Sequence, residues 1–264
     1  MGNTLAFKIL RGGLRSYSDN FRFFLRISLP WLAICLPVYW LGMDYLLAHP
    51  QLEETENLDL IPALIEVLMP ILLSVAFASV AVSWHRHILS GDEQVRVPWL
   101  ALDRAVWRYW WNGMVIFLLA VVVALPVAFA SFWLAGFLGG SLEIVIDILG
   151  FIALFVIIFQ IVYRLSIKLP AIAIGKQSYS YKESWNDSAG EILQFVILGT
   201  IVAFLGKLVS NIEKAMALSL PQVESFLGHY ALISVEPLVQ LFFAGLLISM
   251  LTYTYAYFAE DREL

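Results

Sequence analysis

The sequence predicts an all-α integral membrane protein with six transmembrane helices, arranged as three hairpins that each follow a cytoplasmic amphipathic helix. The chain of 264 residues is 61% hydrophobic and only 14% charged, whereas soluble domains carry about a quarter charged residues. It also contains several continuous apolar runs of roughly 20 residues, the length that crosses a hydrocarbon core of about 30 Å. Continuous runs exclude a membrane β-barrel, because barrel strands alternate apolar and polar residues.

The elements follow from these runs and from the segments between them. Residues 1–26 form a basic amphipathic segment whose helix we expect to be interrupted at Gly12 and Gly13. Residues 98–112 and 178–195 are expected to supply the second and third amphipathic helices, the latter with capping boxes at Ser180/Glu183 and Ser188/Glu191. The whole chain, 1–264, is predicted to be one membrane domain. Its six spans are predicted over about residues 27–48, 61–84, 112–136, 143–164, 191–210 and 237–258.

The orientation follows from the basic residues near the ends of the spans. Of the 16 Lys and Arg residues, all except Lys207 and Lys214 fall on one side of the predicted spans. Lys and Arg collect on the cytoplasmic side of membrane proteins. We therefore expect both termini in the cytoplasm.

Basic residues interleaved with tryptophans are the candidate lipid-contact residues. Arg104 and Arg108 lie four residues apart, and Arg164 and Lys168 repeat that spacing, so each pair shares one helix face. We expect these faces to meet anionic lipid headgroups on the cytoplasmic side, and we expect His85 and His87 to join them. Ordinary interfacial anchoring is the simpler alternative. The candidate residues are Arg86, Arg104, Trp107, Arg108, Trp111, Arg164 and Lys168.

Ionisable residues inside the predicted spans are the candidate ion or proton site. Such groups are costly in lipid and mark transport pathways. The candidates are Glu66, Asp147, Lys207 and Glu236, all expected near the extracytoplasmic ends of their spans and none at the midplane. This placement weakens a transporter hypothesis. Lys207 and Glu236 are expected to pair, and the alternative is an acidic outer vestibule that attracts cations or a basic partner.

Other kinds of chemistry have no support in the sequence. We find no nucleophile–base set, glycine-rich phosphate loop or paired metal-ligand motif. We therefore expect no catalytic residue, no metal site, no cofactor and no nucleic-acid partner. Cys35, the one cysteine in the chain, is expected to be a small core residue.

Two segments resemble a group of known proteins. The first reads VYRLSIKLPAIAIGKQSYSYKESWNDSAGEILQF (162–195), and the second reads SVAFASVAVSWHRHILSGDE (74–93). Together they resemble bacterial multi-pass proteins described as similar to the membrane domain of glycerophosphoryl diester phosphodiesterases. The resemblance implies a bacterial inner-membrane protein. In fused members catalysis belongs to a separate soluble domain, which we do not expect in this chain, so no catalytic residue is carried over.

These observations favour a non-enzymatic accessory, scaffold or lipid-contacting subunit of a larger membrane assembly, with lipids and other membrane proteins as its partners. The alternative is a small oligomeric transporter or permease with an acidic extracytoplasmic vestibule. A weaker alternative is a lipid-modifying membrane enzyme.

Overall fold

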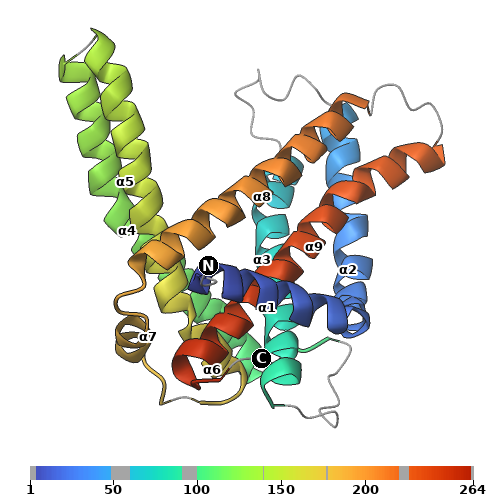
Figure 1. Cartoon of the computed structure of the whole chain (residues 1–264). Helices are drawn as coiled ribbons and strands as arrows, with labels where there is room; N and C mark the ends of the chain where they lie inside the picture. The colour runs from blue at the N-terminus through green and yellow to red at the C-terminus, as the bar shows by residue number, and fades with distance from the viewer. Residues whose placement is uncertain are drawn as a thin grey trace.

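The computed structural model describes residues 4–48, 60–90, 100–138, 140–176, 178–219 and 226–262, and nearly all of them are helical (Figure 1). Within these ranges the helices α2, α3, α4, α5, α8 and α9 are long and apolar enough to cross a membrane. The prediction of an all-helical, multi-pass membrane protein with six spans is therefore confirmed. The helices are α1 (Leu5–Asp19), α2 (Phe21–Ala48), α3 (Leu60–Ser90), α4 (Arg104–Leu138), α5 (Gly140–Ser166), α6 (Lys168–Ala173), α7 (Tyr181–Asp187), α8 (Ile192–Ser219) and α9 (Phe226–Ala259).

Several helices extend beyond the predicted spans. Only Asn20 separates α1 from α2, so α2 begins six residues before the predicted span. Helix α4 begins at Arg104 and continues without a break, so residues 104–112 are its first turns rather than a separate surface helix. Prolines lie inside α2, α3, α4 and α9 without ending them. Membrane helices tolerate internal proline because neighbouring groups satisfy the freed carbonyls.

Helix α1 lies across α9 near the middle of the molecule (Figure 1). The expected interruption at Gly12 and Gly13 is wrong, because α1 is continuous through both residues. A Cβ atom at Gly12 would overlap the ring of Tyr253, and one at Gly13 would lie 3.0 Å from the Cα atom of Met250. The glycines therefore allow the two helices to approach closely.

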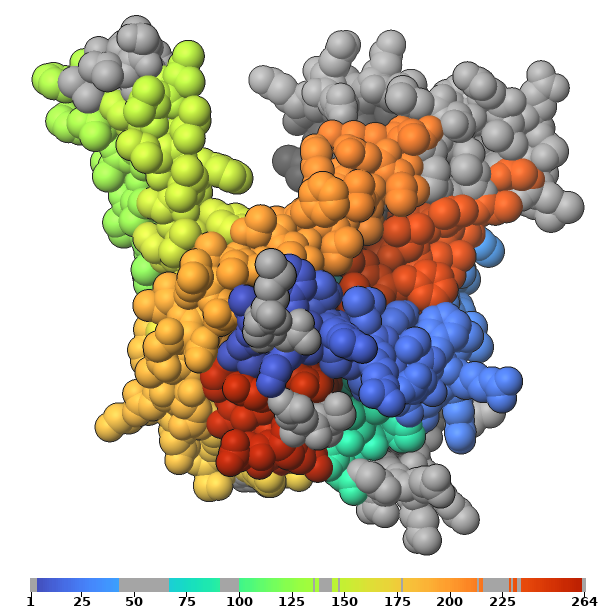
Figure 2. Space-filling view, viewed as in Figure 1, coloured from blue at the N-terminus to red at the C-terminus, as the bar shows by residue number. Residues whose placement is uncertain are grey.

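Helices α4 and α5 lie side by side, and their upper halves stand clear of the other helices (Figures 1 and 2). Large apolar side chains such as Phe129, Phe132 and Phe151 are exposed there. The main buried cluster lies instead among α2, α3, the first half of α4, the end of α5, α6 and α9, and it includes Phe24 and Trp84. The tightly packed part of the molecule is thus the half that also contains α1, α6 and α7.

Helix α6 is a buried element between the predicted fourth span and the third predicted amphipathic segment. All residues from Leu169 to Ala173 are buried. Its apolar sequence, KLPAIA, explains the burial, and Pro170 is tolerated because it lies in the first turn. The helix ends at Ala173, and Gly175 follows two residues later with a φ of 81°, a conformation that glycine adopts readily. This turn returns the chain toward α7 and leaves α6 packed against α3 and α4.

Candidate anion-binding site

A basic pocket of about 480 Å³ lies between the end of α3, the start of α4 and helix α6. It brings together four of the seven residues that the sequence predicts as lipid contacts. The polar side chains in its wall are Arg86, Asp103, Arg104, Arg108, Asn112 and Lys168. Four cations and one carboxylate leave three positive charges, so the pocket is suited to an anion.

Arg104 and Arg108 supply the uncompensated charge. They lie one turn apart on α4, with Arg104 exposed and Arg108 half-buried. In the described part of the chain, neither guanidinium has an acidic partner. Arginine presents several N–H donors in a planar fork that matches phosphate and carboxylate oxygens. These two side chains are therefore the ones available to a ligand.

Arg86 and Asp103 hold the walls of the pocket together. The Nη1 atom of Arg86 lies 2.7 Å from Asp103 Oδ2, and its Nε atom donates to the Ala173 carbonyl at 2.8 Å. Asp103 Oδ1 also accepts from the backbone N–H groups of Ala105 and Val106 at 3.0 and 3.1 Å, which caps α4. Arg86 thereby links α3 to both α6 and α4.

These contacts also set the ionisation of Asp103. Partial burial raises the pKa of this carboxyl group, but the hydrogen bond from Arg86, the backbone donors and the positive charge of Arg86 outweigh that effect. The pKa of Asp103 is therefore below its ordinary value. The pocket keeps its one negative charge at neutral pH.

Lys168 is positioned by a contact to Tyr181 of α7, which is in turn bonded to α4. Its Nζ atom lies 3.9 Å from the ring centroid of Tyr181, a cation–π contact. The Tyr181 hydroxyl donates to Asn112 Oδ1 at 2.7 Å, and Asn112 Nδ2 donates to the Arg108 carbonyl at 2.7 Å. Both polar ends of Asn112 are thus engaged, while the ammonium group of Lys168 still lines the pocket.

Trp107 and Trp111 lie on the same first turns of α4 but do not line the pocket. Their side chains are 49% and 63% exposed. Between them Trp110 contacts both rings and donates from Nε1 to Ser74 Oγ at 2.8 Å. The start of α4 is therefore anchored to α3, with two indole rings left on its outer surface.

Arg164 is placed differently from the other predicted lipid contacts. It is 6% exposed, and its guanidinium stacks 3.6 Å from the ring centroid of Trp185. Its Nε atom donates to Ser188 Oγ at 3.0 Å, and Nη2 donates to the Trp185 carbonyl. The turn at Ile167 separates Arg164 from Lys168, although the spacing predicts one shared face. Arg164 therefore holds α7 against α5.

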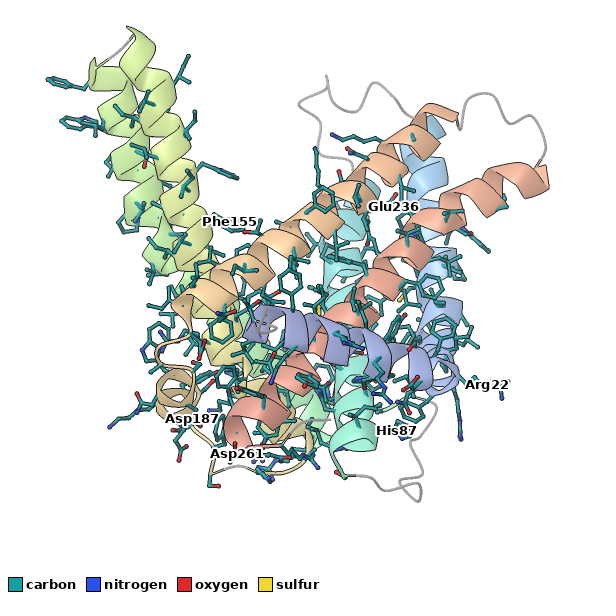
Figure 3. The ribbon with its side chains drawn as sticks, viewed as in Figure 1. Arg22, His87, Phe155, Asp187, Glu236 and Asp261 are labelled. Atoms are coloured by element: carbon teal, nitrogen blue, oxygen red, sulfur yellow. The ribbon has the colours of Figure 1, made fainter. Side chains whose placement is uncertain are left out.

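The predicted ion or proton residues do not assemble into a site within the described part of the chain. Glu236, labelled in the upper half of α9 in Figure 3, accepts from the Tyr39 hydroxyl at 2.5 Å and from Gln240 Nε2 at 3.2 Å. Lys207 is exposed, and no ion pair joins it to Glu236 there. The side chains of Glu66 and Asp147 lie outside the described part.

A buried histidine network was not predicted. His85 is fully buried, with Nδ1 2.8 Å from Thr252 Oγ1 and Nε2 3.2 Å from the Tyr109 hydroxyl. The Thr252 hydroxyl donates to the Ile248 carbonyl, so His85 Nδ1 must donate to Thr252 and Nε2 must accept from Tyr109. His87 stacks on Phe23. Neither histidine lines the pocket, and no sequence signal distinguishes a buried histidine here from an interfacial one.

Comparisons of the chain with protein-family models, curated proteins and solved structures return no match.

Proposed function

We propose that this protein is a non-enzymatic membrane protein that binds the phosphate group of an anionic lipid in its basic pocket. In this role it serves as a lipid-contacting or scaffold subunit of a larger membrane assembly. The observation that carries the proposal is the convergence of Arg86, Arg104, Arg108 and Lys168 on one pocket that contains a single carboxylate.

The position of the pocket favours a lipid headgroup over a soluble anion. Two candidate spans, Arg104–Leu134 and Ile144–Ala173, begin and end at residues of its wall. The exposed rings of Trp107 and Trp111 lie beside it, and tryptophan is enriched at the level of lipid headgroups. A phosphate at this level would be attached to a lipid.

The proposal also includes the orientation of the protein in the membrane and the pairing of its helices into hairpins. We assign the pocket and both termini to the cytoplasm, from the distribution of Lys and Arg. The pairs α2–α3, α4–α5 and α8–α9 are the three hairpins. The location in a bacterial inner membrane rests on the resemblance of residues 74–93 and 162–195 to bacterial multi-pass proteins.

The transporter alternative gains no support from the described residues. Both carboxylate oxygens of Glu236 accept hydrogen bonds from its neighbours Tyr39 and Gln240. Among the described residues, no ion pair joins Lys207 to it. A carboxylate held in this way is suited to a structural role.

The test measures lipid retention by the purified full-length protein. Native mass spectrometry compares retained phosphatidylglycerol with retained phosphatidylcholine after extraction from mixed vesicles. The Arg104→Gln/Arg108→Gln double variant should lose the preference for phosphatidylglycerol by roughly 30-fold, because each charge near an anionic surface contributes about 1 kcal/mol. The matched control is Arg22→Gln, whose side chain is exposed and points away from the molecule (Figure 3).

Two outcomes would contradict the proposal. An unchanged preference in the double variant would show that these arginines do not select the lipid. Displacement of phosphatidylglycerol by soluble inorganic phosphate or glycerol phosphate would show that the pocket takes a free anion instead.

A further inference from the structure

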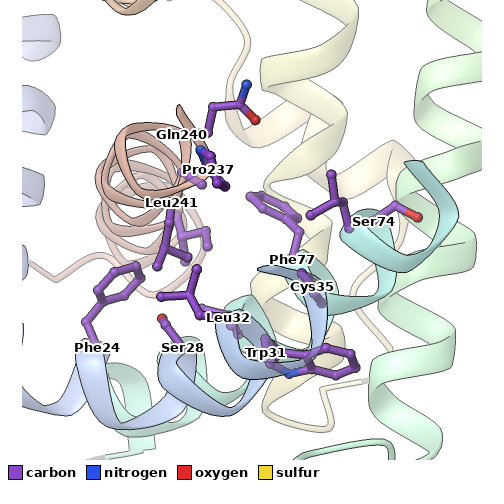
Figure 4. Close-up of a pocket in the computed structure, with 15 residues that line it drawn as sticks. Phe24, Ser28, Trp31, Leu32, Cys35, Ser74, Phe77, Pro237, Gln240 and Leu241 are labelled. Atoms are coloured by element: carbon purple, nitrogen blue, oxygen red, sulfur yellow. The ribbon is translucent and has the colours of Figure 1, made fainter. Parts of the chain in front are cut away.

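A second cavity, of about 330 Å³, lies between α2, α3 and α9 (Figure 4). Helix α2 lines it from Phe24 to Cys35, and α9 lines it from Pro237 to Ile248. Each stretch covers eleven residue steps, which is ~16 Å at a rise of 1.5 Å per residue. The cavity therefore runs along the helices for about half of the ~30 Å hydrocarbon core of a bilayer.

Its lining is apolar and belongs to the membrane-spanning part of the molecule. Leu32, Phe77 and Leu241 are typical of the wall, and Ser28, Ser74 and Gln240 are its polar exceptions. All the lining residues fall within the candidate spans of α2, α3 and α9. The occupant must therefore come from the hydrocarbon layer. A transmembrane helix of ~10–12 Å diameter is too wide for this volume, whereas one hydrocarbon chain fits.

The wall of the cavity contains one unpaired polar group. Within the described part of the chain, the buried atoms Tyr17 Oη, Ser28 Oγ and Trp84 Nε1 have no hydrogen-bond partner, and of these three residues Ser28 lines the cavity. Tyr17 and Trp84 contact the lining residue Phe24, whose ring centroid lies 5.1 Å from that of Tyr17 and 6.0 Å from that of Trp84.

Ser28 lies one turn beyond Phe24 and its hydroxyl points into the cavity (Figure 4). Ser28 is fully buried. A buried donor is destabilising until it is paired, so Ser28 indicates a polar part of a ligand at this end.

We propose that this groove binds one acyl chain of a membrane glycerolipid, with the ester carbonyl of that chain at the Ser28 hydroxyl. An ester carbonyl only accepts hydrogen bonds, and the Ser28 hydroxyl can donate one. The length, direction and polar end of the groove match a chain from the leaflet on the side of the basic pocket. The groove and the pocket are separate sites, since α3 lines the groove with Leu73–Val80 and the pocket with Arg86.

The test uses photo-crosslinking in vesicles of phosphatidylcholine that contain a trace of phosphatidylcholine with a diazirine in one acyl chain. This zwitterionic lipid does not depend on the basic pocket. The full-length protein is irradiated, and adducts are mapped by mass spectrometry. We expect adducts on groove residues such as Cys35 and Leu241.

Phenylalanine substitutions at two alanine positions separate groove binding from general lipid contact. Ala244→Phe fills the groove and should lower groove labelling roughly tenfold, since a tenfold change needs only about 1.4 kcal/mol of lost binding. The matched control is Ala130→Phe on the exposed face of α4, which should leave groove labelling unchanged. Ser28→Ala, which removes one donor with little change in volume, should lower labelling by roughly two- to tenfold.

A measurement on the wild-type protein tests the groove without relying on variants that could misfold. Cys35 is the one cysteine of the chain and lines the groove. Its alkylation by a small membrane-permeant maleimide should be slower in long-chain vesicles than in short-chain detergent. Equal alkylation rates, or equal groove labelling in Ala244→Phe and Ala130→Phe, would overturn the proposal. So would a loss of groove labelling in Arg104→Gln/Arg108→Gln, which would make the groove part of the headgroup site.

Discussion

The two basic–aromatic clusters of this protein look alike in sequence and differ in structure. Both combine cations four residues apart with a nearby tryptophan. Arg164 is buried under Trp185 and bonded to two groups of the protein, whereas Arg104 and Arg108 face a pocket without an acidic partner in the described part of the chain. Residue type and spacing are shared, so the neighbours decide the role.

The difference lies in which groups complete the guanidinium hydrogen bonds. Helix α7 supplies a ring, a hydroxyl and a carbonyl to Arg164. No comparable element covers Arg104 and Arg108 within the described residues. An arginine satisfied by its own protein stabilises the fold, and an unsatisfied one at a lipid boundary is available to an anion.

The largest expected effect is on stability, from Arg164→Ala. We expect the free energy of unfolding to fall by about 2–4 kcal/mol, because two charge-assisted hydrogen bonds and the stacking on Trp185 are lost. Thermal and denaturant unfolding in detergent would measure it. Arg164→Lys should recover only part of the loss, because lysine lacks the planar fork. A variant as stable as the wild type would remove the distinction between the clusters.

Asp103→Ala should have a smaller effect, lowering stability while raising lipid retention. Loss of the α4 cap and of the Arg86 partner should lower the free energy of unfolding by about 1–2 kcal/mol. Retention of phosphatidylglycerol should rise about fivefold, since the pocket gains one net positive charge worth ~1 kcal/mol. If lipid binding falls together with stability, the structural role of Asp103 in the pocket outweighs the effect of its negative charge.

Lys168→Gln should mainly weaken lipid binding. We expect about a fivefold loss of phosphatidylglycerol preference from removal of one charge of ~1 kcal/mol, and a fall of about 0.5–1 kcal/mol in the free energy of unfolding from loss of the cation–π contact with Tyr181. Lys182→Gln on α7, an exposed lysine outside the pocket, is the control for general charge effects. Equal losses in the two variants would argue for diffuse attraction to the membrane surface in place of a pocket.

The smallest expected effect is a pH dependence of stability. The pKa of Asp103 is lower in the folded protein than its ordinary value of 3.8. Its contribution to stability is therefore present above pH ~3.8 and is lost as the pH falls through the folded pKa. The difference in unfolding midpoint between wild type and Asp103→Asn should narrow on acidification. A constant difference would show that Arg86 does not act through the charge of Asp103.

Hydropathy was sufficient to predict the six long helices, because the cost of polar backbone in lipid outweighs local preferences. The capping box at Ser180 and Glu183 was also predicted correctly. The predicted capping box at Ser188 and Glu191 was wrong. Ser188 caps the C-terminus of α7, and its hydroxyl donates to the Ser184 carbonyl. Local pattern identifies a cap only when the helix start is already known.

The candidate site could be predicted as a set of residues but not as a pocket. Periodicity indicates which side chains share a helix face, and it correctly paired Arg104 with Arg108. It could not show that α6 folds under the bundle and carries Lys168 to α4, nor that α7 covers Arg164. Both depend on contacts between segments distant in sequence, from Arg86 to Ala173 and from Tyr181 to Asn112.

The packing of α1 on α9 sets an order of assembly. During synthesis α1 emerges before α9, yet the surface that receives Gly12 and Gly13 is formed by Met250 and Tyr253. The backbone N–H of Ala6 likewise donates to Gln194 on α8. Helix α1 therefore cannot reach its final position until both of these later helices have been synthesised.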